Sequence, residues 1–236
     1  MLTLISLGFM IGIAHAFEAD HVAAVSALVA GKTRKSALVR HGVLWGVGHT
    51  LTLVLVGGVV LVLGIGISNR LALGMEGFVG LMLIGLGLNV LYRLRRDRVH
   101  FHLHRHQALP PHLHLHSHAG ETRPHDPAHH HHAHPDPSVW TTLMVGMVHG
   151  MAGSSALILV VAASIQSLWG AIAYIILFGA GSILGMAAMS LALSVPLTLT
   201  ARLMTRANLA LQVLIGAISI SVGTMTAIAS FRAILA

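Results

Sequence analysis

Residues 12–25 read GIAHAFEADHVAAV, a segment that places two imidazoles and two carboxylates between His15 and His21 of an otherwise apolar stretch. This stretch extends over about 2–30, which exceeds the roughly 20 residues that a helix needs to cross a bilayer. A charged side chain near the bilayer centre costs several kcal/mol. We therefore expect a transmembrane helix whose polar residues have a function, because packing alone does not offset this cost.

Five further apolar stretches follow, and the composition of the chain is typical of a membrane protein. Hydrophobic residues make up 55% of the 236 residues and charged residues 9%, whereas a soluble domain carries about 25% charged residues. The stretches lack the alternation of barrel strands, so helices must satisfy their backbone groups in lipid. The predicted fold is all-α and polytopic, with six transmembrane helices at about 2–30, 37–66, 75–94, 139–165, 169–198 and 207–233.

The two halves of the chain resemble each other. The pattern Gly-x-x-His at 12–15 recurs at 146–149, and LWGVGH at 44–49 has the counterpart LFGAGS at 177–182. The two matches have offsets of 134 and 133 positions, which indicates an internal repeat. Three helices per half make the second copy inverted in the membrane, an arrangement typical of transporters with interrupted helices. We predict two inverted three-helix repeats with interrupted helices, residues 1–95 and 138–236.

Residues 96–137, between the two repeats, differ in composition from the rest of the chain. They hold 14 of the 19 histidines and six of the seven prolines. Frequent proline disfavours long helices, and the near absence of large apolar residues after Leu115 disfavours a core. We therefore expect a disordered loop. Imidazoles at such spacing are typical of a weak metal buffer. The candidate binding residues are His102, His104, His112, His114, His116, His118, His130 and His132.

The basic residues predict the orientation in the membrane. Twelve of the 14 Lys and Arg residues fall on the side of the His-rich segment 96–137, and Arg70 and Arg232 fall on the other side. Positive charge marks cytoplasmic loops. We expect a multi-pass protein of the cell (inner or plasma) membrane, with the His-rich loop in the cytoplasm and both termini outside.

Imidazoles and carboxylates inside the predicted spans form a candidate metal site. This ligand set suits Ni, Co, Zn or Cu, whereas all-oxygen sites favour Mg and Ca. Asp20 and His21 point about 140° and 240° around an ideal helix from His15, so the three converge only where the first helix is interrupted. The predicted metal ligands are His15, Asp20, His21, His49 and His149, and the predicted supporting or proton-coupling residues are Glu18, Ser154 and Ser155. His41, near a helix end, is expected at the membrane interface.

The segment HAFEADH at 15–21 is an H-x4-D-H element, and it resembles the signature of the nickel/cobalt transporter family. The continuation VAAVS at 22–26 and the stretch LWGVGHT at 44–50 look most like the six-span, urease-accessory-type nickel transporters. The resemblance implies transport of Ni²⁺, often with Co²⁺. It also implies that His15, Asp20 and His21 are substrate ligands and that His49 belongs to a second motif. Residues 149–155, HGMAGSS, depart from the acidic motif that longer family members carry there.

The predicted function is a helical carrier of Ni²⁺, with Co²⁺ as a second substrate, that works in uptake rather than export. The chain has no G-x-x-x-x-G-K-[ST] loop for ATP, so a gradient, the membrane potential or a partner would drive this secondary transporter. We expect no enzymatic activity and no bound cofactor, since the metal ion is the substrate. The expected partners are the divalent ion, the lipid bilayer, cytoplasmic nickel chaperones and urease or hydrogenase maturation proteins, and no nucleic acid.

Three alternatives stay open at this point. An exporter of Ni, Co or Zn would load its metal from the His-rich loop, and a metal-sensing or chaperone scaffold in the membrane would use that loop as its active part. An intramembrane metallohydrolase would need a fixed metal with an open water position, but the chain contains no H-E-x-x-H element. Ligand types alone do not select among these metals.

Overall fold

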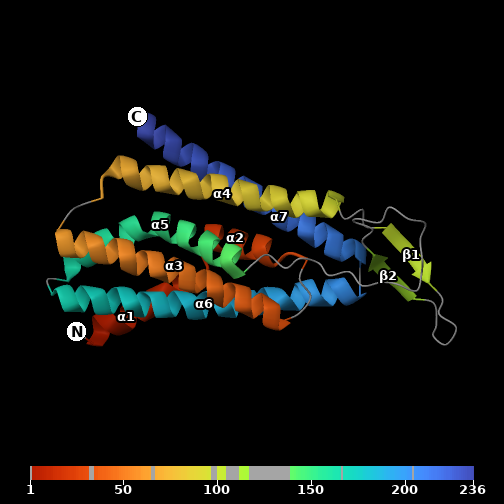
Figure 1. Cartoon of the computed structure of the whole chain (residues 1–236), viewed down its shortest axis with the longest axis horizontal. Coiled ribbons are helices and arrows are strands. Elements are labelled where there is room, and N and C mark those ends of the chain that lie inside the picture. The colour runs from red at the N-terminus through yellow and green to blue at the C-terminus, as the bar shows by residue number, and fades with distance from the viewer. Residues whose placement is uncertain are drawn as a thin grey trace.

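The computed structural model of the chain describes residues 2–31, 35–64, 67–96, 100–104, 112–116, 139–165, 167–203 and 205–236. Its elements are α1 (Leu2–His15), α2 (Ala19–Val29), α3 (Lys35–Leu63), α4 (Asn69–Arg96), β1 (His100–His104), β2 (His112–His116), α5 (Val139–Ser164), α6 (Leu168–Leu203) and α7 (Thr205–Leu235). The helices lie along the long axis of the molecule (Figure 1). The bundle is therefore helical, as the sequence predicted.

Four helices in the described part of the chain are long and apolar enough to cross a bilayer, namely α3, α4, α6 and α7. The first predicted span is divided between α1 and α2, which are too short to cross alone, and the described apolar part of α5 covers Val139–Ala152. These lengths support a membrane-inserted helical bundle. Six crossings stay a prediction.

Helix α3 shows which residues face the bundle and which face outward. Its inner side carries His41, Trp45 and His49 at intervals of four residues, each at most 1% exposed. Its outer side exposes large apolar side chains, Leu51, Leu55, Val59 and Val62. A helix with imidazoles inside and aliphatic side chains outside suits a lipid environment, because polar groups in the bilayer must face the bundle interior.

The first span is interrupted between α1 and α2. The N–H groups of Phe17 and Glu18 donate to the carbonyls three residues earlier, at 3.0 and 3.1 Å, so the end of α1 tightens into a turn. Glu18 then has an extended backbone with φ −63° and ψ 152°, and α2 begins at Ala19. The interruption lies between His15 and Asp20, in the part of the first span where the sequence predicted it.

Glycines bring the backbones of neighbouring helices into contact. A Cβ added at Gly12 of α1 would overlap the carbonyl oxygen of Phe178 on α6, and one at Gly146 of α5 would overlap the carbonyl oxygen of Trp45 on α3. Gly12 and Gly146 are 134 positions apart, and Trp45 and Phe178 are 133 positions apart. The contact between α1 and α6 therefore recurs between α5 and α3.

A second pair of contacts repeats in the same way. A Cβ added at Gly48 of α3 would overlap the carbonyl oxygen of Leu143 on α5, and one at Gly181 of α6 would overlap the carbonyl oxygen of Phe9 on α1. The offsets are again 133 and 134 positions. Figure 1 shows that α3 runs away from the end that carries β1 and β2, whereas α6 runs toward it. Equivalent contacts thus involve helices of opposite direction.

Helices α4 and α7 pack through two glycine pairs. A Cβ at Gly80 would lie 2.7 Å from the carbonyl oxygen of Gly223, and one at Gly87 would lie 2.6 Å from the carbonyl oxygen of Gly216. Small residues at such crossings let helices approach closely in membranes. The Ser219 hydroxyl also donates to the Leu83 carbonyl at 2.9 Å, which ties the two helices together at this crossing.

The ends of the chain and the strands β1 and β2 lie at opposite ends of the bundle. Both termini are at the end where α1 begins and α7 finishes, and β1 and β2 lie at the other end (Figure 1). This arrangement agrees with an even number of crossings per chain, in which both termini share one side of the membrane.

The prediction of a disordered loop over 96–137 was wrong for ten of its residues. Strands β1 and β2 pair antiparallel, with His102 opposite His114 and His104 opposite His112. Both strands alternate histidine with an apolar residue, HFHLH and HLHLH, and this period of two is the pattern of a β-strand. The prediction weighed proline content and overlooked this alternation. Most of the remaining residues of the segment lie outside the described residues.

Substitution of Gly48 tests the close helix crossings. We expect Gly48→Ala to destabilise the folded bundle by about 1–3 kcal/mol, because overpacking forces the backbones of α3 and α5 apart. Gly58, on the same helix, is the matched control, since an added Cβ meets nothing within 4 Å there. Gly58→Ala should be neutral or stabilising, because alanine favours the helix. Thermal unfolding of the two purified variants in detergent compares them, and equal midpoints would refute the tight crossing.

Candidate metal centre

Four imidazoles from four helices meet at the interruption of the first span. His15 is the last residue of α1, His21 lies in the first turn of α2, His49 lies in the middle of α3, and His149 comes from α5. The ring centroids of His15 and His21 are 4.3 Å apart, and those of His21 and His149 are also 4.3 Å apart. The His49 ring lies 5.2 Å from that of His21 and 5.4 Å from that of His15. We call these four residues the His cluster.

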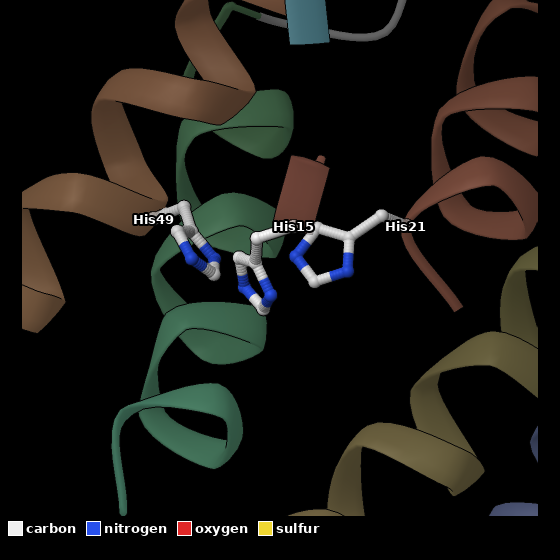
Figure 2. Close-up of side chains that lie close together, drawn as sticks. All are labelled: His15, His21 and His49. Atoms are coloured by element: carbon white, nitrogen blue, oxygen red, sulfur yellow. The ribbon is translucent and has the colours of Figure 1, made fainter. Parts of the chain in front are cut away.

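Two sets of side chains in and beside the His cluster have the spacing of metal ligands. One set is His15, His21 and His49 (Figure 2), and the other is Asp20, His21 and His149. Within each set the ligand atoms lie within 4.8 Å of one another. Nitrogen ligands about 2.0–2.1 Å from an ion are at most about 4.2 Å apart, so small side-chain adjustments bring His15, His21 and His49 onto one ion. In the second set Asp20 is hydrogen-bonded to both imidazoles, and an ion bound by all three would replace these hydrogen bonds. His21 belongs to both sets.

The His cluster is shielded from solvent. His21, His49 and His149 are at most 1% exposed, and the side chain of His15 is 12% exposed. Several buried ring nitrogens have no hydrogen-bond partner among the described residues, namely Nε2 of His21, both nitrogens of His49 and Nδ1 of His149. A buried polar atom without a partner costs free energy. Each neutral ring has one nitrogen with a free lone pair, and a bound cation would provide a partner for it.

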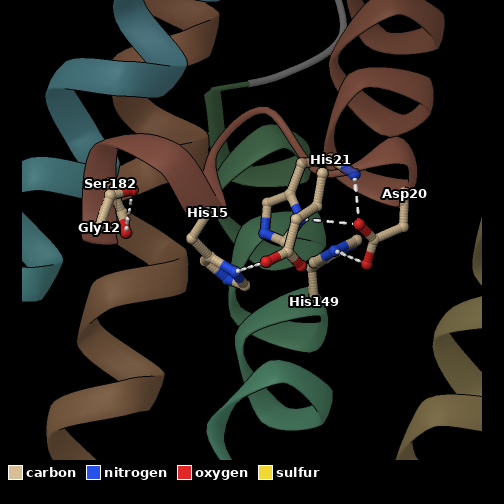
Figure 3. A network of polar contacts seen from close by, with 7 residues as sticks. Gly12, His15, Asp20, His21, His149 and Ser182 are labelled. Carbon is tan, nitrogen blue, oxygen red and sulfur yellow. Dashed lines mark hydrogen bonds and ion pairs between the residues drawn. The ribbon is translucent and has the colours of Figure 1, made fainter. Parts of the chain in front are cut away.

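Two carboxylates orient three of the imidazoles. One oxygen of Asp20, Oδ1, accepts from Nδ1 of His21 at 2.9 Å and from its backbone N–H at 2.8 Å. The other, Oδ2, accepts from Nε2 of His149 at 3.1 Å. Glu18 Oε1 accepts from Nδ1 of His15 at 2.9 Å. Figure 3 shows that Asp20 lies between the rings of His21 and His149.

These contacts decide which ring nitrogens can bind a metal. An ionised carboxylate accepts hydrogen bonds but donates none, so Nδ1 of His21 and Nε2 of His149 carry the protons. In the neutral imidazole the other nitrogen then offers its lone pair. The remaining nitrogens are Nε2 of His21 and Nδ1 of His149, and both are buried without a partner. Metal-binding histidines commonly have such a carboxylate on the far nitrogen.

A curated protein matches most of the chain. The urease accessory protein UreH of Bacillus sp. (strain TB-90) is 33% identical over 204 residues, which cover 86% of this chain and 81% of the relative. This chain belongs to the UreH family. The match confirms the family resemblance drawn from residues 15–21 and 44–50. No family model and no solved structure matches the chain.

Trp45 is a residue of this UreH-family chain that the sequence reasoning missed. It is fully buried, and its ring centroid lies 5.3 Å from that of His21, 5.1 Å from that of His149 and 6.4 Å from that of His49. The ring of Phe178 lies 5.2 Å from that of His15. The repeat contained the signal, because LWGVGH and LFGAGS place Trp45 and Phe178 at equivalent positions one turn before His49 and Ser182.

The structure also locates other residues that the sequence analysis had singled out. Glu18 is 58% exposed and contacts His15. Ser154 and Ser155 belong to α5, but their side chains lie outside the described residues. His41 is buried in the bundle, at 1% exposed, and its Nδ1 lies 2.7 Å from Oγ1 of Thr142. Its place at the membrane interface stays a prediction. Helix packing, rather than distance from the helix end, decides its burial.

The histidines of the predicted metal buffer divide into two groups. His102, His104, His112, His114 and His116 lie on β1 and β2. His118, His130 and His132 lie outside the described residues. The antiparallel register aligns three pairs of histidines, at positions 100 and 116, 102 and 114, and 104 and 112. Metal binding by this segment stays a prediction.

Proposed function

We propose that this UreH-family protein transports Ni²⁺ across the cell membrane, with Co²⁺ as a second substrate, and that it works in uptake. The proposed ligands are His15, Asp20, His21, His49 and His149. The observation that carries the proposal is the convergence of four imidazoles, three of them buried with ring nitrogens that have no partner among the described residues. The family resemblance to nickel/cobalt transporters supports the choice of ion.

The chemistry of the His cluster supports a transition-metal ion rather than Mg²⁺ or Ca²⁺. Imidazole nitrogens dominate both candidate ligand sets, whereas Mg²⁺ and Ca²⁺ prefer all-oxygen sites. The two carboxylates, Glu18 and Asp20, also matter for charge, because together they balance a divalent cation. An ion held by neutral imidazoles beside these carboxylates leaves the centre with no net charge, which lowers the cost of its burial in the membrane.

The helix contacts support alternating access between two inverted repeats. The contact of Gly12 with Phe178 recurs as that of Gly146 with Trp45, and the helices involved run in opposite directions. Inverted repeats with a central site and an interrupted helix are typical of secondary transporters. In the proposed cycle the two repeats, residues 1–95 and 138–236, rearrange around the His cluster and expose it to one side at a time.

The His-rich segment 96–137 is proposed to receive the ion in the cytoplasm. Its strands β1 and β2 lie at the end of the bundle opposite to both termini, and the distribution of Lys and Arg residues supports a cytoplasmic location for that end. Its imidazoles would bind the released metal weakly and pass it to cytoplasmic nickel chaperones or maturation proteins. We propose no catalytic role and no bound cofactor, because the ion itself is the cargo.

The test is ⁶³Ni²⁺ flux into proteoliposomes that contain the full-length protein. We expect accumulation above that of empty vesicles, and we expect His15→Ala and Asp20→Ala to reduce it to background. Deletion of residues 100–134 should reduce the flux only partly. Unchanged flux in both variants would reject the assignment of the metal site. Complete loss of flux on deletion of residues 100–134 would favour the metal-sensing scaffold. Lower nickel content in overexpressing cells would show an exporter instead.

A further inference from the structure

Three imidazoles of the His cluster are buried, whereas the side chains of His15 and Asp20 are 12% and 32% exposed. An ion therefore reaches the nitrogens of His21, His49 and His149 only after other side chains move. Two aromatic rings contact the cluster, those of Trp45 and Phe178. Their positions relative to the cluster show which side each ring closes.

Trp45 lies on the side of the cluster that faces β1 and β2. It precedes His49 by four residues, or about 6 Å along α3 at 1.5 Å per residue, and α3 begins at the end that carries the strands (Figure 1). Its ring contacts the rings of His21, His49 and His149. The indole therefore covers these three imidazoles on the side that faces β1 and β2.

Phe178 lies on the opposite side. Its backbone carbonyl contacts Gly12, which precedes His15 by three residues on α1, and α1 begins at the end of the bundle that carries the termini (Figure 1). The ring of Phe178 contacts His15, and the residue is only 3% exposed. Leu53 and Tyr174 pack with it in one buried apolar cluster. This layer separates the His cluster from the end that carries the termini.

The two rings occupy equivalent positions of the internal repeat. They are 133 positions apart, and their carbonyl oxygens contact the equivalent glycines, Gly146 for Trp45 and Gly12 for Phe178. Each ring thus lies at the closest crossing between a helix of one half and a helix of the other. A rearrangement of the halves about these crossings moves each ring relative to the cluster.

The indole of Trp45 also lacks the hydrogen bond that a purely structural tryptophan usually has. Its Nε1 is buried and has no partner among the described residues, whereas buried tryptophan N–H groups usually find one. An unpaired N–H raises the free energy of the closed position. Movement of the ring toward a more polar environment would give this N–H a partner.

We propose that Trp45 and Phe178 are the two barriers of the transport path. Trp45 closes the His cluster toward the His-rich segment, and Phe178 closes it toward the termini. This inference rests on the proposed transport function, and it adds the residues that control access. With both rings in place, His21, His49 and His149 are buried from both sides.

The chain contains no cysteine, so His49→Cys introduces a single thiol at the centre of the cluster. His49 is fully buried and its ring nitrogens have no partner in the described part of the chain, so this change removes no hydrogen bond seen there. The thiol is treated with a membrane-impermeant methanethiosulfonate reagent from each side of oriented membrane vesicles, without metal. Protease cleavage within residues 100–134 identifies the side of the His-rich segment.

We expect the thiol to be protected from both sides while both rings are present. Adding Trp45→Ala should remove the protection on the side of the His-rich segment, and adding Phe178→Ala should remove it on the other side. Trp45→Phe, which keeps an aromatic ring, should retain protection. Leu38→Ala is the matched control, because Leu38 is a fully buried aliphatic residue on the same helix as Trp45. We expect this variant to leave the thiol protected.

The assignment would be overturned if Trp45→Ala and Phe178→Ala each exposed the thiol to the side opposite to the expected one. It would also be overturned if either alanine variant were labelled from both sides, or if Leu38→Ala were labelled as strongly as the alanine variants. Continued protection in both alanine variants that remain monodisperse in detergent would also overturn it. If Trp45→Ala does not assemble, Trp45→Leu is used with the same expected outcome. The labelling requires no nickel, so it tests the barriers separately from the transport of nickel. The expected labelling pattern without ⁶³Ni²⁺ flux would reject Ni²⁺ as the transported ion but would still support Trp45 and Phe178 as barriers.

Discussion

Replacement of His21 by alanine is expected to weaken Ni²⁺ binding by at least about 100-fold, the largest effect of any single imidazole. His21 belongs to both candidate ligand sets, so its loss leaves each set with two members. Loss of a residue that only supports a ligand typically costs 10–100-fold in affinity, and loss of a ligand shared by both sets should cost more. Calorimetric titration of the purified full-length protein with Ni²⁺ measures the change.

His41→Ala is the matched control for this result. His41 is as buried as His21, at 1% exposed, and it lies on the same face of α3 as His49. It contacts Thr142 and belongs to neither ligand set. We expect its replacement to leave the affinity for Ni²⁺ nearly unchanged. An equal loss in both variants would show that the titration reports the general integrity of the bundle, and the role of His21 would then be rejected.

The convergence of residues far apart in the sequence was the most predictable feature. His15, Asp20 and His21 cannot face one point from a regular helix, so a common site required an interruption, and α1 ends where that argument placed it. The repeat at 133–134 positions brought His149 to the same centre, because it is the counterpart of His15. Metal binding by these residues stays a prediction, which the positions of the side chains support.

The remaining features depend on tertiary packing that composition does not show. Trp45 reads as an ordinary apolar residue in a hydrophobic span, and only the packing of α2, α3 and α5 places its ring against three imidazoles. The burial of His41 likewise depends on its contact with Thr142 of α5. Strands β1 and β2 were missed because proline content describes the whole segment, whereas alternation over five residues decides a strand.

Asp20→Asn is expected to weaken Ni²⁺ binding by about 10–100-fold, the effect typical of removing a group that orients a ligand histidine. The carboxylate accepts hydrogen bonds from both His21 and His149. Asparagine has one acceptor oxygen, and its NH₂ group only donates. One of the two imidazoles must then turn its lone pair toward the amide, which moves its proton to the nitrogen that faces the His cluster.

Glu18→Gln provides the graded comparison for this prediction. Glu18 contacts only one imidazole and is 58% exposed, so its loss should cost less than that of Asp20. Ni²⁺ titration ranks the variants, and X-ray absorption spectroscopy counts the imidazoles on the bound ion. We expect the count to fall in Asp20→Asn, because one ring presents N–H instead of a lone pair. A carboxylate that only contributed a ligand oxygen would leave the imidazole count unchanged. An unchanged count, or a larger loss of affinity in Glu18→Gln, would therefore contradict the orienting role of Asp20.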